Sequence, residues 1–203
     1  FSPSISYAET SMSKEGQYIF NSLGFYLGGV LVAFMAAGFC MLESGLVTTK
    51  SVSTIAAKNV GKFAICSLVF FLFGYNMAYG VPEGGYIGSM KIWGDVSNIG
   101  TGYSDSSDWF FQTMFVCATA SIVSGAIVLG AREGRFGSKG EKKSMVPFAA
   151  SSIPLVTLGT FLLWFGWFGF NGFSQLAMGT FDDVNAISKI AVNTHLAGAA
   201  GTV

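Results

Sequence analysis

One short segment of the sequence gathers side chains that can bind a small cation. The stretch LLWFGWFGFNGFSQ, residues 162–175, holds two Trp and four Phe among three Gly, and it closes on Asn, Ser and Gln. Trp and Phe faces attract compact cations by about 2 kcal/mol per desolvated contact, and a hydroxyl accepts hydrogen bonds from ammonium-like donors. The composition therefore favours a site for a small monovalent cation that also donates hydrogen bonds.

The spacing of this segment places its aromatic and polar side chains on one side of a helix. At about 100° per residue, one stripe contains Trp167, Phe170, Asn171 and Ser174. The opposite side contains Gly166, Gly169 and Phe173, and a glycine face lets a second helix approach closely, as do Gly24 and Gly28 earlier in the chain. Polar side chains at membrane depth mark transport pathways. Ordinary helix packing explains the same stripe, so the pattern alone leaves both interpretations open.

A second segment repeats the combination of rings and polar groups. Phe111 and Phe115 lie one turn apart, with Gln112 beside them and Thr119 below. No acidic residue falls within the predicted membrane spans after Glu43, so a carboxylate-lined metal pore is disfavoured. We expect Glu43 itself to extend its carboxylate to the membrane interface near the end of its helix.

The elements that carry these residues are predicted to be membrane-spanning helices. The chain has 203 residues, of which 51% are hydrophobic and 11% charged, against about 25% charged in a soluble domain. A soluble protein with this many apolar helices would need a much larger domain to cover them. At the required length of about 20 apolar residues, the predicted spans are Leu23–Leu46, Val60–Tyr79, Trp109–Ala131 and Met145–Phe170.

A weaker fifth span is predicted at Ala186–Val203, because Lys189, Asn193 and His195 interrupt its apolar run. We therefore predict an all-α, polytopic helical membrane protein with about five transmembrane helices. A lipid bilayer is among its expected partners. Residues 1–203 are expected to form one membrane domain, because no repeat or linker divides them.

The basic residues predict the orientation, because positively charged loops stay cytoplasmic. Basic residues between the first two spans are Lys50, Lys58 and Lys62, and those after the third are Arg132, Arg135, Lys139, Lys142 and Lys143. Residues 80–108 carry one Lys against four acids and are rich in Gly and Ser, which indicates an irregular outer loop. The N-terminus is therefore expected outside. Its polar start without an initiator Met favours a removed leader or a fragment.

Other reactive side chains are few. Cys40, Cys66 and Cys117 lie in apolar runs, and we interpret them as small buried residues rather than disulfide partners or metal ligands. One His and one intramembrane Glu assemble no catalytic set, so an enzyme is disfavoured and no cofactor or metal is predicted. The formal net charge of zero gives no indication of a nucleic-acid partner.

Four stretches of the chain, in order, resemble the signatures of a known family, the ammonium transporters (Amt and Rh). AGFCMLESGLVTTKSVSTIAAKN is similar to the first-helix signature of that family and FFQTMFVCATASIVSG to its third-helix signature. GTFLLWFGWFGFNGFSQLAMG and VNTHLAGAAG are similar to its sixth and seventh helices. The resemblance implies a trimeric inner-membrane protein of about eleven helices with one pore in each subunit. The implied substrate is ammonium or ammonia, with methylammonium as a further candidate, and a cytoplasmic regulatory protein is a candidate partner.

The resemblance also implies roles for particular residues. Phe115 and Phe170 match the two phenylalanines that gate the pore of the family. The implied outer substrate-binding site consists of Phe111, Trp167 and Ser174. Gln112 and Asn171 are pore-lining candidates, and Phe173 stands where the family prefers a small residue on the close-packing face.

One departure from the family is large. IVSG is followed at once by AIVLGAREGRF, which resembles the close of the fifth helix of the family. The end of the third helix, the whole fourth helix and the start of the fifth are therefore missing, with a vestibule Trp, a buried Asp and the first of two pore histidines. The chain would cover about half of the family's length, so the second pore histidine, which belongs to the C-terminal half, is also missing. His195 matches neither histidine, and a polar residue that faces another helix is the favoured interpretation over a substitute proton relay.

The missing relay limits the predicted function. A complete chain of this kind is expected to conduct poorly or not at all, whereas a fragment of a longer protein is expected to belong to an ordinary ammonium transporter. A membrane sensor that binds ammonium without conducting it is the main alternative.

Overall fold

The computed structural model describes residues 12–129 and 149–202, and the regular elements in those ranges are all helical. The longer helices are α1 (Lys14–Leu46), α2 (Val52–Val69), α4 (Asp105–Leu129), α5 (Ile153–Gly172) and α6 (Phe181–Ala200). Short elements are η1 (Thr49–Ser51), the π-helical turn η2 (Phe70–Gly74), α3 (Tyr75–Tyr79), η3 (Ile99–Thr101) and η4 (Phe173–Gln175). The all-α prediction is confirmed.

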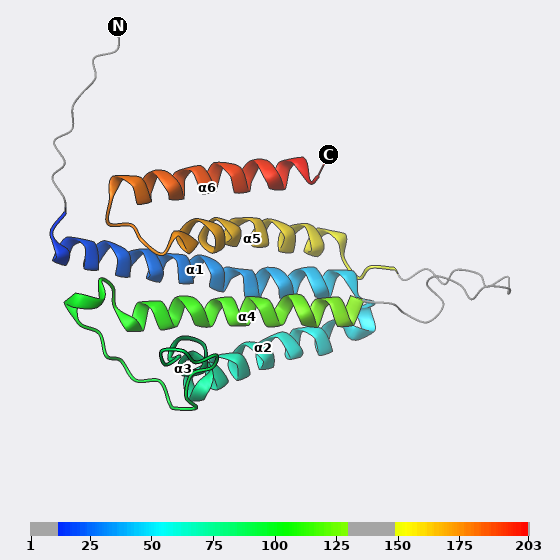
Figure 1. Cartoon of the computed structure of the whole chain (residues 1–203). Helices are drawn as coiled ribbons and strands as arrows, with labels where there is room; N and C mark the ends of the chain where they lie inside the picture. Colours follow the sequence, from blue (N-terminus) through cyan, green and yellow to red (C-terminus); the bar gives the residue numbers. More distant parts are fainter. Residues whose placement is uncertain (1–11, 130–148, 203) are drawn as a thin grey trace, which may run out of the picture.

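Helix α1 lies at the centre of the bundle. Figure 1 shows α5 and α6 on one side of α1, and α4 and α2 on the other. The contacts of α1 with α5 and α4 are the most extensive between helices. We call the end of the bundle with residues 80–104 and 173–180 the loop end, and the end where α1 passes into α2 the lysine end.

Glycines explain why α1 and α5 pack closely. A Cβ added to Gly159 of α5 would lie 2.5 Å from the backbone nitrogen of Leu42, and one added to Gly166 would lie 3.0 Å from the carbonyl oxygen of Leu31. Helices in a bilayer associate through such close packing, because lipid tails are as apolar as the side chains and the hydrophobic effect does not drive the helices together. The predicted close approach on the glycine face is therefore confirmed.

Phe173 is accommodated by glycines of the facing helix. A Cβ added to Gly28 of α1 would lie 2.7 Å from the Cβ of Phe173, and one added to Gly24 would lie 3.5 Å from the Phe173 ring. The bulk at position 173, where a small residue was expected, is thus matched by absent side chains on α1. The two helices remain in contact because Gly24 and Gly28, which have no side chains, leave room for the ring of Phe173.

Four helical segments are long and apolar enough to cross a membrane among the residues described: Lys14–Leu46, Thr49–Tyr79, Asp105–Ile127 and Ile153–Gln175. The four stronger predicted spans are each matched, with different bounds. Helix α1 starts at Lys14 instead of Leu23, and α5 starts at Ile153 instead of Met145. Helix α2 starts at Val52 instead of Val60, which places Lys58 on the helix instead of in a connection. Helix α6 corresponds to the weak fifth span and is not among the four.

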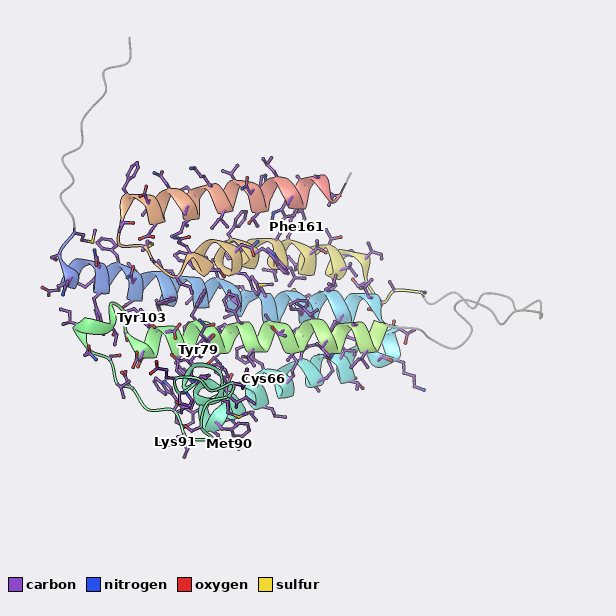
Figure 2. All side chains as sticks on the ribbon, in the orientation of Figure 1. Cys66, Tyr79, Met90, Lys91, Tyr103 and Phe161 are labelled. Carbon is purple, nitrogen blue, oxygen red and sulfur yellow. The ribbon has the colours of Figure 1, made fainter. Side chains whose placement is uncertain are left out.

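The loop end is held by specific hydrogen bonds. The amide of Asn21 donates to the carbonyl of Gly102 (3.0 Å) and its oxygen accepts from the N–H of Met178 (2.7 Å), so α1 is tied to both loops. The N–H of Trp93 donates to the carbonyl of Phe71 in the π-helical turn. Figure 2 shows Tyr103 beside the start of α4, and Met90 and Lys91 at the edge of the bundle. Residues 80–104 form the irregular loop that the sequence predicts.

Some sequence predictions concern residues outside the described ranges. These are the polar residues 1–11 and the basic residues Arg132, Arg135, Lys139, Lys142 and Lys143.

Candidate functional site

A continuous row of aromatic rings joins three helices from the loop end toward the middle of the bundle. We call it the aromatic chain, and its members in order are Tyr103, Phe25, Phe111, Phe115, Phe170 and Trp167. Successive ring centroids lie between 4.2 and 5.5 Å apart. Burial, followed by the charge of Asp108, raises the pKa of the Tyr103 hydroxyl, so this first ring stays neutral.

The predicted gate residues lie next to each other. The ring centroids of Phe115 on α4 and Phe170 on α5 are 4.2 Å apart with an angle of 35° between the ring planes. Phe111 meets Phe115 edge-on at 4.7 Å. Phe111 is only 1% exposed, because its ring fills the space over Gly28 of α1. Phe111 therefore supports Phe115 from the core of the bundle.

Trp167, Phe170 and Ser174 form a second grouping at the end of α5. The rings of Trp167 and Phe170 are stacked at 5.5 Å with an angle of 17°. Ser174 lies in the η4 turn that follows α5, is exposed, and donates its hydroxyl proton to the carbonyl of Phe170 at 2.5 Å. Because that proton is engaged, the oxygen of Ser174 is left to accept hydrogen bonds.

The two pore-lining candidates have polar partners away from the aromatic chain. The amide of Gln112 donates to Oδ1 of Asp108 at 3.1 Å. The amide of Asn171 donates to Oγ1 of Thr194 at 3.1 Å, so it links α5 to α6. The structure does not bring these two amides together.

Asp108 is a buried polar residue that the sequence analysis missed. It lies in the first turn of α4, is 6% exposed, and accepts from the hydroxyl of Tyr75 at 2.5 Å and from Gln112. The predicted span began at Trp109, because acidic residues were taken as loop. Acidic side chains are favourable at a helix N-terminus, and this general preference would have placed Asp108 on the helix.

Glu43 does not extend to the membrane interface as expected. It is 1% exposed, and its Oε2 lies 2.6 Å from Nζ of Lys58 on α2. The prediction was wrong because Lys58 was placed before the second span, whereas the structure has it on α2, facing Glu43. An oppositely charged partner on the neighbouring helix makes burial of the carboxylate tolerable.

His195 is exposed on α6 and lies against aromatic rings of α5. Its ring centroid is 5.5 Å from that of Trp164 and 6.3 Å from that of Phe168. It therefore faces a neighbouring helix, as the sequence analysis favoured. Across residues 12–129 and 149–202, no three His, Cys, Asp or Glu side chains lie close enough to share a metal ion.

Comparison with known sequences gives a family match over nearly the whole described chain. The model of the "Ammonium Transporter Family" matches residues 24–128 and 125–203. The two matches meet within α4, where the sequence departs from the continuous family pattern.

Individual relatives are longer than this chain. An ammonium-transporter-like protein of Synechocystis sp. is 31% identical and covers 95% of this chain, which spans 57% of that protein. Ammonium transporter Amt2 of Archaeoglobus fulgidus is 28% identical over 86% of this chain and 51% of its own length. Ammonium transporter 3 of Dictyostelium discoideum aligns with all of this chain over 261 positions, so that relative carries residues absent from these 203. The chain spans about half the length of the curated relatives it matches.

Solved structures share the fold. A structure named "Sensor Amt Protein" superposes with a TM-score of 0.61 and 22% identity, covering 84% of this chain and 58% of its own. The crystal structure of Mep2 from Candida albicans superposes with a TM-score of 0.62 and 19% identity, covering 82% of this chain and 50% of its own. The chain is a multi-pass helical membrane protein with the architecture of these structures.

Proposed function

Because this chain belongs to the Ammonium Transporter Family, we propose that it moves ammonium or ammonia across a membrane, with its outer recruitment site at the end of α5. The observation that carries the proposal is the exposed hydroxyl of Ser174 beside the stacked rings of Trp167 and Phe170. The oxygen accepts a hydrogen bond from an ammonium N–H, and the ring faces attract the charge. The relatives named above are ammonium transporters, which supports the substrate class.

The gate in this proposal is the pair Phe115 and Phe170. Their contact at 4.2 Å closes the path beneath the recruitment site, and buried Phe111 holds Phe115 in place. Gln112 and Asn171 flank the path as polar pore-lining candidates.

The positive charge of ammonium opposes its passage through such a gate. Transfer of a bare ion from water into a medium of low dielectric costs on the order of 20 kcal/mol by the idealised Born estimate. Two or three ring contacts at about 2 kcal/mol each do not offset that cost. The substrate therefore crosses the dry section as neutral ammonia, and the proton stays behind or moves by a separate relay. Histidine, with an unperturbed pKa near 6.5, is suited to such a relay.

A second candidate function is binding of ammonium without conduction. Two observations favour it. Known relatives carry a segment that this chain lacks, and one structure with the same fold is named a sensor. In this reading the residues at the end of α5 recruit the cation, and the signal passes to another protein on the cytoplasmic side.

We further propose that the chain lies in the inner membrane with its N-terminus outside, and that it assembles as a homotrimer with a cytoplasmic regulatory protein as a partner. The distribution of Lys and Arg supports this orientation, since Lys50, Lys58 and Lys62 all belong to the lysine end. The loop end, where Ser174 lies, then faces outward.

One experiment separates the two functions. The 203-residue chain is reconstituted in vesicles, and both the uptake and the equilibrium binding of labelled methylammonium are measured. Saturable uptake above that of empty vesicles supports transport, and saturable binding without uptake supports sensing. Absence of both contradicts the proposal.

A further inference from the structure

A cluster of charged and polar side chains around the buried Glu43 lies at the lysine end, away from the aromatic chain, and the proposed transport does not use it. At its centre, Oε2 of Glu43 on α1 accepts from Nζ of Lys58 at 2.6 Å and from the amide of Asn59 at 2.9 Å. Glu43 is 1% exposed and Asn59 is 5% exposed. The carboxylate is therefore held by α2 in a fixed position.

Helix α4 supplies the remaining polar groups of the cluster. Nζ of Lys58 also donates to the hydroxyl oxygen of Ser124. Nζ of Lys62 donates to Oδ1 of Asn59 at 2.7 Å and to the hydroxyl oxygen of Ser121. The ammonium group of Lys58 thus lies between a carboxylate of α1 and a hydroxyl of α4.

The backbone of α4 completes the enclosure. A Cβ added to Gly125 would lie 3.0 Å from Oε1 of Glu43, so this glycine lets the carboxylate approach the helix. Oε1 is buried and has no hydrogen-bond partner among the described residues. One carboxylate oxygen, Oε2 of Glu43, and the hydroxyl oxygen of Ser124 therefore accept from the ammonium group, while the second carboxylate oxygen is buried against α4 without a partner.

Lys58 reaches this position from the surface. Its side chain is 28% exposed, whereas that of Glu43 is 2% exposed. The stem of Lys58 thus occupies a route that leads from solvent to the carboxylate. Removal of the stem would leave the acceptors in place and open that route.

We propose that Glu43 and Ser124 form a second binding site for primary ammonium cations, and that Lys58 occupies this site in the intact chain. A lysine head group is itself a primary ammonium, so the structure contains a bound example of the ligand class. Because Lys58 is covalently attached, its effective concentration at the site is in the millimolar range or higher, and free amines do not displace it at lower concentrations. Lys62, one turn further along α2, discourages a second cation by repulsion.

The test uses Lys58→Ala, which empties the site, and methylammonium as the probe. All variants carry Ser174→Ala, which removes the proposed outer site, and the readout is thermal unfolding in detergent. We expect the midpoint of Lys58→Ala to rise with methylammonium concentration, with an apparent affinity roughly tenfold or more above that of the parent with Lys58 in place. Potassium and tetramethylammonium chloride, which lack N–H donors, are expected to produce no such rise.

Two further variants locate the effect. Addition of Glu43→Gln to Lys58→Ala is expected to abolish the response to methylammonium, because the charged acceptor is lost. Lys50→Ala, which removes an exposed lysine of η1, is the matched control and is expected to behave as the parent. If Lys58→Ala does not fold, its yield of monodisperse protein should increase when methylammonium, but not potassium, is present during solubilisation.

Specific outcomes overturn the proposal. They are an equal response of Lys58→Ala and its parent, an equal response to methylammonium and potassium, and a response that survives Glu43→Gln. The readout is binding to the isolated protein. Failure here therefore leaves the transport proposal untouched, and failure of transport leaves this site untouched.

Discussion

The rings of Phe115 and Phe170 meet across two helices, with centroids 4.2 Å apart and an angle of 35° between their planes. Each ring has a further aromatic partner, Phe111 for the former and Trp167 for the latter. The contact is therefore the central link of the aromatic chain, and it joins α4 to α5 at the proposed gate.

A double-mutant cycle with Phe115→Leu and Phe170→Leu should reveal the energy of this contact. Aromatic pairs contribute about 0.5–1.5 kcal/mol beyond their buried area, so we expect a coupling free energy of that size in the free energy of unfolding. Phe161 of α5 is 62% exposed, and its substitution by Leu is expected to show no coupling with Phe115→Leu. A coupling of zero for the first pair would contradict the ring contact.

Substitution of Ser174 by Ala tests the recruitment site. The variant loses the hydroxyl acceptor of the proposed site, and one hydrogen bond to a charged donor is worth about 1.5–3 kcal/mol. We expect methylammonium binding to weaken by about tenfold or more. Ser188→Ala is the matched control, because the hydroxyl of Ser188 makes the same bond to the carbonyl four residues earlier, on α6. Equal losses in both variants would rule out a specific role for Ser174.

Two glycines on different helices should respond in opposite ways to substitution by Ala. At Gly159 the new Cβ would lie 2.5 Å from the backbone nitrogen of Leu42, which cannot move independently of α1, so we expect a loss of about 1–3 kcal/mol in stability. At Gly61 of α2 no atom lies within 4 Å, so the better helix propensity of Ala should stabilise by about 0.5–1 kcal/mol. Thermal unfolding of both variants in detergent measures the difference, and a neutral Gly159→Ala would contradict the close α1–α5 contact.

Asp183 links the turn of Ser174 to the start of α6, and its contribution should depend on pH. Its carboxylate accepts from the hydroxyl and the N–H of Thr180 and from the amide of Gln175. Its own N–H donates to the hydroxyl oxygen of Thr180, which completes a capping box. These bonds, with that from the Thr180 side chain first, lower the pKa of Asp183. A lowered folded-state pKa means that the stabilisation is fully present above the unfolded value of about 3.9 and is lost as the pH falls through the folded value.

Asp183→Asn should therefore reduce stability by about 1 kcal/mol at pH 7, and its difference from the parent should shrink as the pH falls through the lowered pKa of Asp183. Unfolding midpoints measured from pH 7 downward check this. Asp182→Asn, on the exposed neighbour in the same first turn, is the control. A difference that persists unchanged at low pH would show that the carboxylate charge is not responsible.

The sequence by itself determined the class of fold, the order of the helices and the face on which α5 packs. A helix that crosses a bilayer must be long and apolar, so composition and length specify the spans of α1, α2, α4 and α5 without reference to partners. Glycines at one helical spacing specify the close contact, because small residues let two helix backbones approach. The pairing of Phe115 with Phe170 was also expected, since the family resemblance assigned both to one gate.

Only the tertiary structure decided which polar groups meet. Glu43 and Lys58 form an ion pair because the faces of α1 and α2 that carry them lie against each other. The residue pattern of one helix does not specify how the neighbouring helix is rotated about its own axis. The same holds for Asp108 with Tyr75, for Asn171 with Thr194, and for Phe173, whose ring fits because Gly24 and Gly28 stand opposite. Burial in a membrane bundle is a property of two facing surfaces, and one sequence segment encodes only one of them.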